Sequence, residues 1–293
     1  MSILNVIKFN ETGIPPWTTD DEGKVLSIKE NKLAWVEMNG TPVEPEIEEY
    51  KWVILPNKYT IYNEEGTVLK TENKTLNEWE APISGDYVIQ LHAAGGKGGN
   101  TYAKYVSNGA SYPMTQYTVT GATGGGGGGS GAKITLTLNK GTNHTLSVSN
   151  SKASFDNYYV NKGTDGENGN INTVTGGKGG AYGTYANGMT LLAEAGKDGG
   201  ASTETMASFY NYYSEGGDRG NGSALKDAND TGAYGNGGSA GSFLGGSLTG
   251  GEGEVNEAEG KTSNLGPAII IRRKLEWFNM GIFIPPPWKE IQV

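Results

Sequence analysis

The chain has 293 residues, of which 48 are glycine and none is cysteine, and its formal net charge is −9 at pH 7. The lack of cysteine excludes disulfides, zinc–thiolate sites and thiol nucleophiles. The acidic balance, without a basic stripe or polybasic run, argues against nucleic acid or an anionic membrane as the partner. The first residues lack the features of a signal peptide, and no window approaches eighteen apolar residues, so we expect neither a signal peptide nor a membrane-spanning helix.

The first 47 residues are expected to form a small β module that ends in an acidic linker. Residues 25–28 and 33–36 are two short, mostly apolar runs, and the four polar residues between them predict a hairpin. Residues 39–49 contain two prolines and four glutamates, a composition typical of an extended, self-repelling linker. The sequence therefore places a module boundary at residue 47.

Residues 48–274 carry the patterns of a larger, mostly β domain in which helix signals are nearly absent. Two runs, 133–138 and 144–148, alternate cleanly across a short polar turn and predict a hairpin. Residues 266–273 form an unbroken apolar run that ends in charged residues, which indicates a strand buried on both faces. The basic triplet at 272–274 is interpreted as the solvated end of this strand and not as a phosphate-binding site. Other expected strands are 50–54, 59–62 and 67–70, and residues 79–91 are expected to form a turn and a strand.

Glycine is concentrated between Gly95 and Gly266, a stretch that holds 42 of the 48 glycines. Holding one glycine in a single conformation costs about 0.5–1 kcal/mol more than holding alanine, so ordering all of them costs on the order of 20–40 kcal/mol. Either this stretch is disordered or contacts between main chains offset the loss. Because strand patterns continue through the same stretch, we favour an ordered structure.

No catalytic, cofactor or metal motif stands out. The glycine run at 124–129 is not followed by a helix or by the lysine of a phosphate loop, and the candidate calcium loop at 227–232 lacks required ligands. His92 and His144 lie within strand patterns and are interpreted as structural. Nothing selects a catalytic pair for glycoside hydrolysis among the loop acids, so we predict a protein that is not an enzyme and has no cofactor or metal. These acids are Asp156, Asp165, Glu167, Asp198, Glu204, Glu215, Asp218 and Asp227.

The clearest functional signal is the aromatic content of the inserts between glycine clusters, at 100–120, 151–162, 181–194, 201–215 and 223–231. Tyrosine rings stack on sugars or apolar patches, their hydroxyls form hydrogen bonds, and ordering their two torsions loses little entropy. Covering a thin core is an equal alternative for any single tyrosine. The candidate ligand-binding residues are Tyr102, Tyr105, Tyr112, Tyr117, Tyr158, Tyr159, Tyr210, Tyr212 and Tyr213.

The order of motifs at 79–96, 124–148 and 266–272 resembles the glycine-rich domains of bacteriophage tail fibres and receptor-binding proteins. The likeness covers about residues 76–273, and the chain is also similar to the distal adhesins of T-even phages and to the polyglycine domains of some animal receptor kinases. The resemblance implies a β-sandwich-like frame with packed polyglycine II helices, which are threefold and extended like polyproline II. Residues 23–35 are similar to short repeats in tail-fibre attachment regions.

The resemblance implies a virion protein of a phage tail fibre or tail tip, or of a phage-tail-like particle. Residues 1–47 would attach it to the fibre or baseplate, and residues 48–274 would bind a bacterial surface glycan or cell-wall polymer. A homotrimer is implied, with a monomer as the alternative. The apolar tail at 275–293 would pack against another subunit or a partner, or fold onto its own domain. The competing functions are a structural baseplate or virion decoration subunit without a ligand, and a glycan depolymerase.

Overall fold

The computed structural model describes residues 24–29, 32–37, 50–111, 114–220, 222, 234–263 and 266–274. Contacts divide the chain into two units, Met1–Ile47 and Glu48–Val293, and the division falls where the acidic linker was expected to end. In the first unit, β1 (Lys24–Lys29) pairs antiparallel with β2 (Lys32–Glu37), which confirms the predicted hairpin. The expected apolar tail lies outside the described residues. Within the described ranges, no helix is long and apolar enough to cross a membrane.

The second unit is mostly β, as expected, and its described part contains one seven-stranded and two four-stranded sheets. The order of the largest is β14 (Thr190–Leu191), β10 (Ala132–Leu138), β7 (Gly85–His92), β17 (Ala268–Arg273), β3 (Lys51–Leu55), β4 (Lys58–Tyr62) and β5 (Val68–Glu72). The second sheet has the order β13 (Tyr158–Asn161), β12 (Lys152–Phe155), β11 (Asn143–Val148) and β6 (Glu78–Glu80). These two sheets pack into what we call the base sandwich.

The base sandwich buries alternate side chains of its strands in one hydrophobic core. Ile269 and Ile271 of β17 face this core from the middle of the large sheet, where β17 lies between β7 and β3. Trp79 of β6 contacts the rings of Trp52 and Tyr87 edge-on, at centroid distances of 5.2 and 5.3 Å. Because β17 is buried almost throughout and paired on both edges, it confirms the predicted doubly buried strand.

The predicted hairpin at 133–148 is wrong in its pairing, although both strands exist. β10 pairs with β7 and β14, whereas β11 pairs with β6 and β12 in the other sheet. The connection turns a corner of the sandwich: Gly141 takes a positive φ of 79° and donates its N–H to the carbonyl of Ala81 at 2.8 Å. Alternation fixes which side chains face a core, but it does not choose the partner strand.

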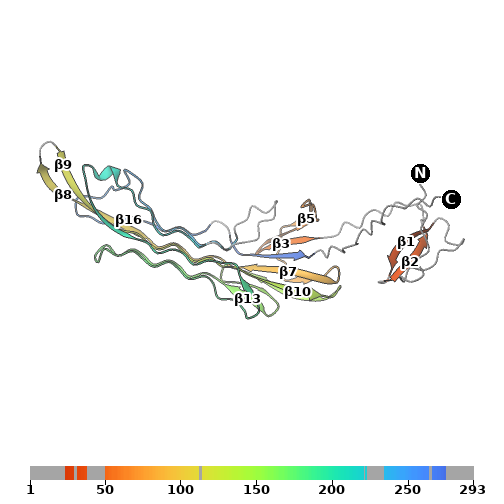
Figure 1. The fold of residues 1–293 in the computed structure, drawn as a ribbon. Coiled ribbons are helices and arrows are strands. Elements are labelled where there is room, and N and C mark those ends of the chain that lie inside the picture. The colour runs from red at the N-terminus through yellow and green to blue at the C-terminus, as the bar shows by residue number, and fades with distance from the viewer. Residues whose placement is uncertain are drawn as a thin grey trace, which may run out of the picture. The chain divides into compact units, whose positions relative to one another are not determined.

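A third sheet lies at the other end of the unit, with the order β15 (Ala201–Met206), β9 (Met114–Ala122), β8 (Thr101–Ser111) and β16 (Asn256–Ala258). We call it the distal sheet. Figure 1 shows long extended segments running side by side between the base sandwich and the distal sheet. These segments, here called the glycine bundle, are 94–100, 123–131, 162–170, 175–184, 193–200, 214–220, 235–243 and 258–263.

The segment 123–131 occupies the centre of the glycine bundle. Every residue from Gly125 to Gly129 both donates and accepts a main-chain hydrogen bond, with N–O distances of 2.8–3.0 Å. The partners recur every third residue; for example, Gly125 and Gly128 both donate to 162–170 and both accept from 94–100. Six segments surround the centre in this way: 94–100, 162–170, 175–184, 193–200, 214–220 and 235–243.

The six surrounding segments also bond to one another and close a ring. Gly166 donates to the carbonyl of Lys97 at 2.8 Å, and Gly238 donates to that of Gly96 at 2.7 Å, which joins the last ring segment to the first. The eighth segment, 258–263, lies outside the ring, where Lys261 bonds to two ring segments. The central segment is therefore enclosed by main chain on all sides, and the three-residue period is the one that packed threefold helices require.

The close approach of the main chains explains the run of glycines at the centre. A Cβ added to Gly126 would lie 1.9 Å from the carbonyl oxygen of Asp218, and one added to Gly125 would lie 2.1 Å from that of Lys178. In the ring, Gly163, Gly166 and Gly169 face the centre, where a Cβ would lie 2.1–2.2 Å from a carbonyl oxygen. The centre therefore admits no side chain between Gly124 and Gly128, whereas ring positions that point outward carry side chains such as that of Asp165.

Replacing a central glycine should therefore disrupt the bundle. We expect Gly126→Ala to lower the free energy of unfolding by more than about 3 kcal/mol, because the neighbours that a Cβ meets are main-chain atoms of an enclosed segment. Gly200→Ala is the matched control: nothing lies within 4 Å of its added Cβ, so it should be neutral or stabilising by up to about 1 kcal/mol. Thermal and urea unfolding of the two variants would measure the difference, and equal stabilities would contradict the enclosed packing.

His92 ends β7 at the junction of the base sandwich with the glycine bundle. Its side chain is fully buried, and its Nδ1–H donates to the carbonyl oxygen of Ser130, 3.1 Å away. Burial lowers the pKa of His92 to about 4, and the bond to Ser130 only partly opposes that shift. The imidazole is therefore neutral at pH 7, which agrees with the structural role expected of it.

The junction should weaken in mild acid. Because the pKa of His92 is lower in the folded state than its usual 6.5, its stabilising contribution is complete above pH 6.5 and is lost as the pH falls toward 4. The loss amounts to about 3 kcal/mol by pH 4. His92→Asn keeps an N–H donor but does not titrate, so urea unfolding between pH 7.5 and 4 should show a shallower loss of stability in the variant. Parallel curves for the two proteins would refute this coupling.

Candidate ligand-binding site

The distal sheet has a small hydrophobic core of its own, separate from that of the base sandwich. Ala103 of β8 and Val119 of β9 are fully buried in it, and they pack with the buried Phe243, which ends the seventh bundle segment, and with Leu248 just after it. These contacts fix the loops at this end of the unit. The distal sheet and its core thus lie at the end of the glycine bundle opposite the base sandwich (Figure 1).

Aromatic rings form a stack on the distal sheet. Phe209 lies parallel to Tyr105, with ring centroids 4.0 Å apart and an interplanar angle of 7°, and meets Tyr117 edge-on at 5.3 Å. Phe209 belongs to the short 3₁₀ helix η2 (Phe209–Asn211), whose first turn is capped by the hydroxyl of Ser208. The next ring, Tyr210, lies 4.2 Å from Phe209 and is 59% exposed. The stack therefore leads from the distal core to the surface.

Other large side chains are exposed in the loops around the distal sheet. Tyr213 is 57% exposed and its hydroxyl donates to Glu215 at 2.8 Å, which fixes the ring while leaving its face accessible. Leu244 and Val255 expose more than half of their surface on the neighbouring loops. Exposed aromatic and apolar groups on a well-supported surface are typical of binding sites.

Two of the predicted tyrosines are buried in the distal core. Tyr212 is only 1% exposed, and a Cβ at Gly121 would lie 1.8 Å from its hydroxyl oxygen, so the ring is packed tightly against β9. Tyr105 is likewise buried under Phe209. Both rings support the surface rather than forming it, which is the alternative that the sequence left open for any single tyrosine. Tyr117 is half-buried beside them, and Tyr102 is half-buried on β8 near β16.

The remaining candidates lie apart from this group. Tyr158 and Tyr159 belong to β13 of the base sandwich, at the opposite end of the unit. Tyr158 packs against the sandwich core, and the ammonium group of Lys152 lies 4.7 Å from the centre of the Tyr159 ring. The side chain of Tyr112 lies outside the described residues. The structure thus brings Tyr105 and Tyr117 of the first insert together with rings of the fourth insert, and it separates the tyrosines of the second insert from them.

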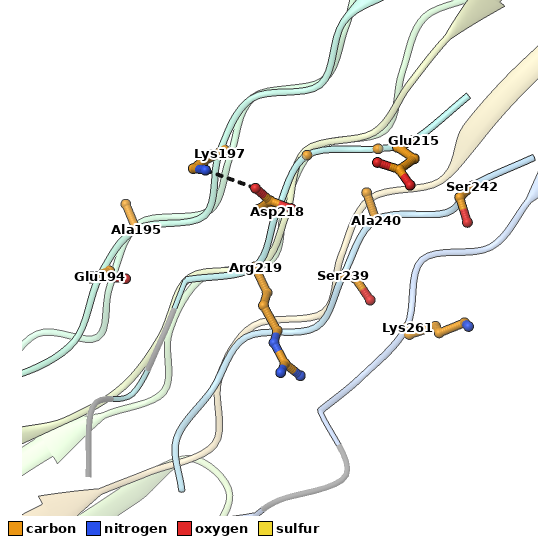
Figure 2. A pocket seen from close by; sticks show the side chains of 12 residues that line it. Glu194, Ala195, Lys197, Glu215, Asp218, Arg219, Ser239, Ala240, Ser242 and Lys261 are labelled. Atoms are coloured by element: carbon orange, nitrogen blue, oxygen red, sulfur yellow. Dashed lines mark hydrogen bonds and ion pairs between the residues drawn. The ribbon is translucent and has the colours of Figure 1, made fainter. Parts of the chain in front are cut away.

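A groove of about 530 Å³ runs along the outside of the glycine bundle, between segments that include 193–200, 214–220 and 235–243. Figure 2 shows the ion pair between Lys197 and Asp218, 2.8 Å apart, and the guanidinium of Arg219 directed away from it. The hydrogen bond and charge of Lys197 lower the pKa of Asp218, so the pair stays ionised at neutral pH. Charges of both signs line this groove, which therefore does not favour a ligand of one charge.

Several of the loop acids that the structure describes have structural partners. Asp156 accepts hydrogen bonds from His144 at 2.7 Å and from the N–H of Thr145 at 2.8 Å. Partial burial would raise the pKa of Asp165, but hydrogen bonds from Lys162 and from the N–H of Lys97 lower it overall. A glycosidase needs an acid whose pKa is raised, the opposite of the shift at Asp165 and Asp218. Within the described ranges, no group of three or more His, Asp or Glu residues could hold a metal ion.

Several surface residues were missed by the sequence analysis. Phe209 adjoins Tyr210 in the same aromatic insert, so counting all rings rather than tyrosines alone would have found it. Leu244 and Val255 carried no signal, because single apolar residues in a loop are as common in cores as in binding surfaces.

Comparison of the chain with family models, curated proteins and solved structures finds no match. The site is therefore interpreted from its own residues.

The aromatic stack should hold the distal surface in place. We expect Phe209→Ala to destabilise the distal sheet locally by about 2–3 kcal/mol, through lost burial and lost stacking on Tyr105. Hydrogen exchange would then accelerate in β8 and β9 while β7 and β17 of the base sandwich keep their protection. Tyr213→Ala, which removes an exposed ring, serves as the control. A uniform change over all strands would contradict the separate distal core.

Proposed function

We propose that this chain is an adhesin of a phage tail fibre or tail tip, or of a phage-tail-like particle, and that its distal surface binds a glycan or cell-wall polymer on bacteria. The observation that carries the proposal is the exposed pair Tyr210 and Tyr213, presented next to a stacked aromatic cluster at the end of a rigid bundle. Rigid, amphipathic rings contribute large contact area at a small entropic cost. Binding rather than catalysis is the activity that these residues favour.

The architecture of the glycine bundle also supports this proposal. We propose that the bundle segments are polyglycine II helices, because their hydrogen bonds recur every third residue and their inward positions admit only glycine. Residues 1–47 would attach the protein to its fibre or baseplate. The bundle completes its ring of hydrogen bonds within one chain, so a homotrimer would associate through other surfaces and would gain avidity from repeated weak sites.

Two other functions predict different behaviour. A structural baseplate or decoration subunit would bind no cells, and the exposed rings would contact another virion protein. A glycan depolymerase would shorten purified surface polymer, and substitution of an acid such as Glu215 would abolish that activity. Because Glu215 instead holds the hydroxyl of Tyr213, we favour adhesion.

The binding role of the distal rings can be tested on a panel of bacterial strains. We expect the fluorescently labelled wild-type protein to bind some strains selectively, and the double variant Tyr210→Ser, Tyr213→Ser to bind them at least about tenfold more weakly, since two stacking faces are lost. The matched control is Tyr158→Ser, Tyr159→Ser, which changes two rings at the opposite end of the unit and should bind as the wild type does.

The outcomes separate the candidate functions. Selective binding that the distal variant loses and the base variant keeps would support adhesion through the distal surface. Equal binding by all three proteins would show that neither pair of rings contacts the bacterial surface, and that another part of the molecule does. Binding to no strain by correctly assembled protein would favour the structural subunit.

A further inference from the structure

A pocket of about 370 Å³ lies where the turn between the third and fourth bundle segments meets the distal sheet. Asn168, Asn170 and Asn172 line it from the turn, and Tyr102 lines it from β8. Val255 and the buried Ile171 add apolar surface. The volume is within the range of small-ligand sites, and none of the lining side chains is charged.

The ring of Tyr102 is held in a fixed orientation. Its hydroxyl donates to Oε1 of Glu257 at 3.1 Å, and the side-chain amide of Asn100 donates to the same oxygen at 2.5 Å. Burial raises the pKa of Tyr102 above its ordinary value, so the phenol remains a hydrogen-bond donor at neutral pH. An aromatic ring that is ordered before a ligand arrives loses little entropy on binding.

The three asparagines retain unused hydrogen-bonding groups. Oδ1 of Asn168 accepts from the N–H of Asn100, and Oδ1 of Asn170 accepts from the N–H groups of Asn172 and Thr173. Their amide nitrogens, and the whole side-chain amide of Asn172, have no partner in the described part of the chain. Three exposed amides beside one oriented ring supply both donors and acceptors without any charge.

We infer that this pocket binds an uncharged sugar unit. The apolar face of a pyranose would stack on Tyr102, and its hydroxyls, which both donate and accept, would bond to the amides of Asn170 and Asn172. A carboxylated or phosphorylated sugar would find no cation among the lining residues to replace its lost hydration. The inference rests on the proposed adhesion function and narrows its ligand to a neutral saccharide on the bacterial surface.

The test uses the full chain and saturation-transfer NMR with glucose, galactose, mannose and N-acetylglucosamine, and with glucuronate as the charged comparison. We expect transfer to at least one neutral sugar and none to glucuronate. Tyr102→Leu should weaken binding about tenfold, whereas Tyr102→Phe, which keeps the stacking face, should weaken it less. Asn172→Ala removes a side chain without internal partners, so it should weaken binding several-fold at unchanged stability. Tyr182→Leu removes an exposed ring outside the pocket and is the control.

The results distinguish this inference from the adhesion proposal. No transfer to any neutral sugar, equal transfer to glucuronate, or binding that both Tyr102→Leu and Asn172→Ala leave unchanged would overturn the neutral-sugar site. Strain binding is measured in parallel with the same proteins. Cells bound without sugar binding would leave adhesion standing through the rings of Tyr210 and Tyr213, whereas sugar binding without any bound strain would reject adhesion but keep the pocket.

Discussion

The second unit depends on main-chain hydrogen bonds that the segment 123–131 makes to six neighbours. These bonds form where main chains approach more closely than a Cβ permits: a Cβ added at Gly126 would lie only 1.9 Å from the carbonyl oxygen of Asp218. The entropic cost of ordering so many glycines is therefore linked directly to the contacts that offset it. Of the two hydrophobic clusters among the described residues, one lies in the base sandwich and the other at the distal sheet. Hydrogen bonding rather than apolar burial therefore stabilises the glycine bundle between them.

This division of roles relates the fold to the proposed function. The base sandwich aligns the strands that continue into the glycine bundle. Hydrogen bonds between the bundle segments keep these chains aligned as far as the distal sheet, without a hydrophobic core. The distal core of Tyr105, Tyr212 and Phe243 then orients the rings above it. Loops that would be costly to order by themselves are thus attached to a support that keeps them in one arrangement, which lowers the entropy lost on binding a ligand.

The sequence predicted the positions of the strands better than it predicted which strands pair with each other. Period-two alternation located β10 and β11, but it could not show that a corner at Gly141 sends them into different sheets. The glycine content indicated that main chains pack closely. It could not show which segments surround 123–131, because glycines carry no side chains that would identify a distant partner segment. For the site, successive bundle segments run in opposite directions, so the connections between them lie alternately at the distal end and at the base end. That parity separates Tyr158 and Tyr159 from the distal rings, and Asn170 and Asn172 lie in a short turn that lacks aromatic residues.

The three-residue period also determines how the chain can change in length. One residue inserted near the start of 162–170 would shift the later part of the segment by one place in its three-residue period, so that Asp165 and Asn168 would take the inward places of Gly166 and Gly169. Insertions and deletions inside the bundle are therefore compatible with the fold only in multiples of about three residues. The distal loops have no such restriction, and descendants of this sequence can lengthen or exchange them while the support stays the same.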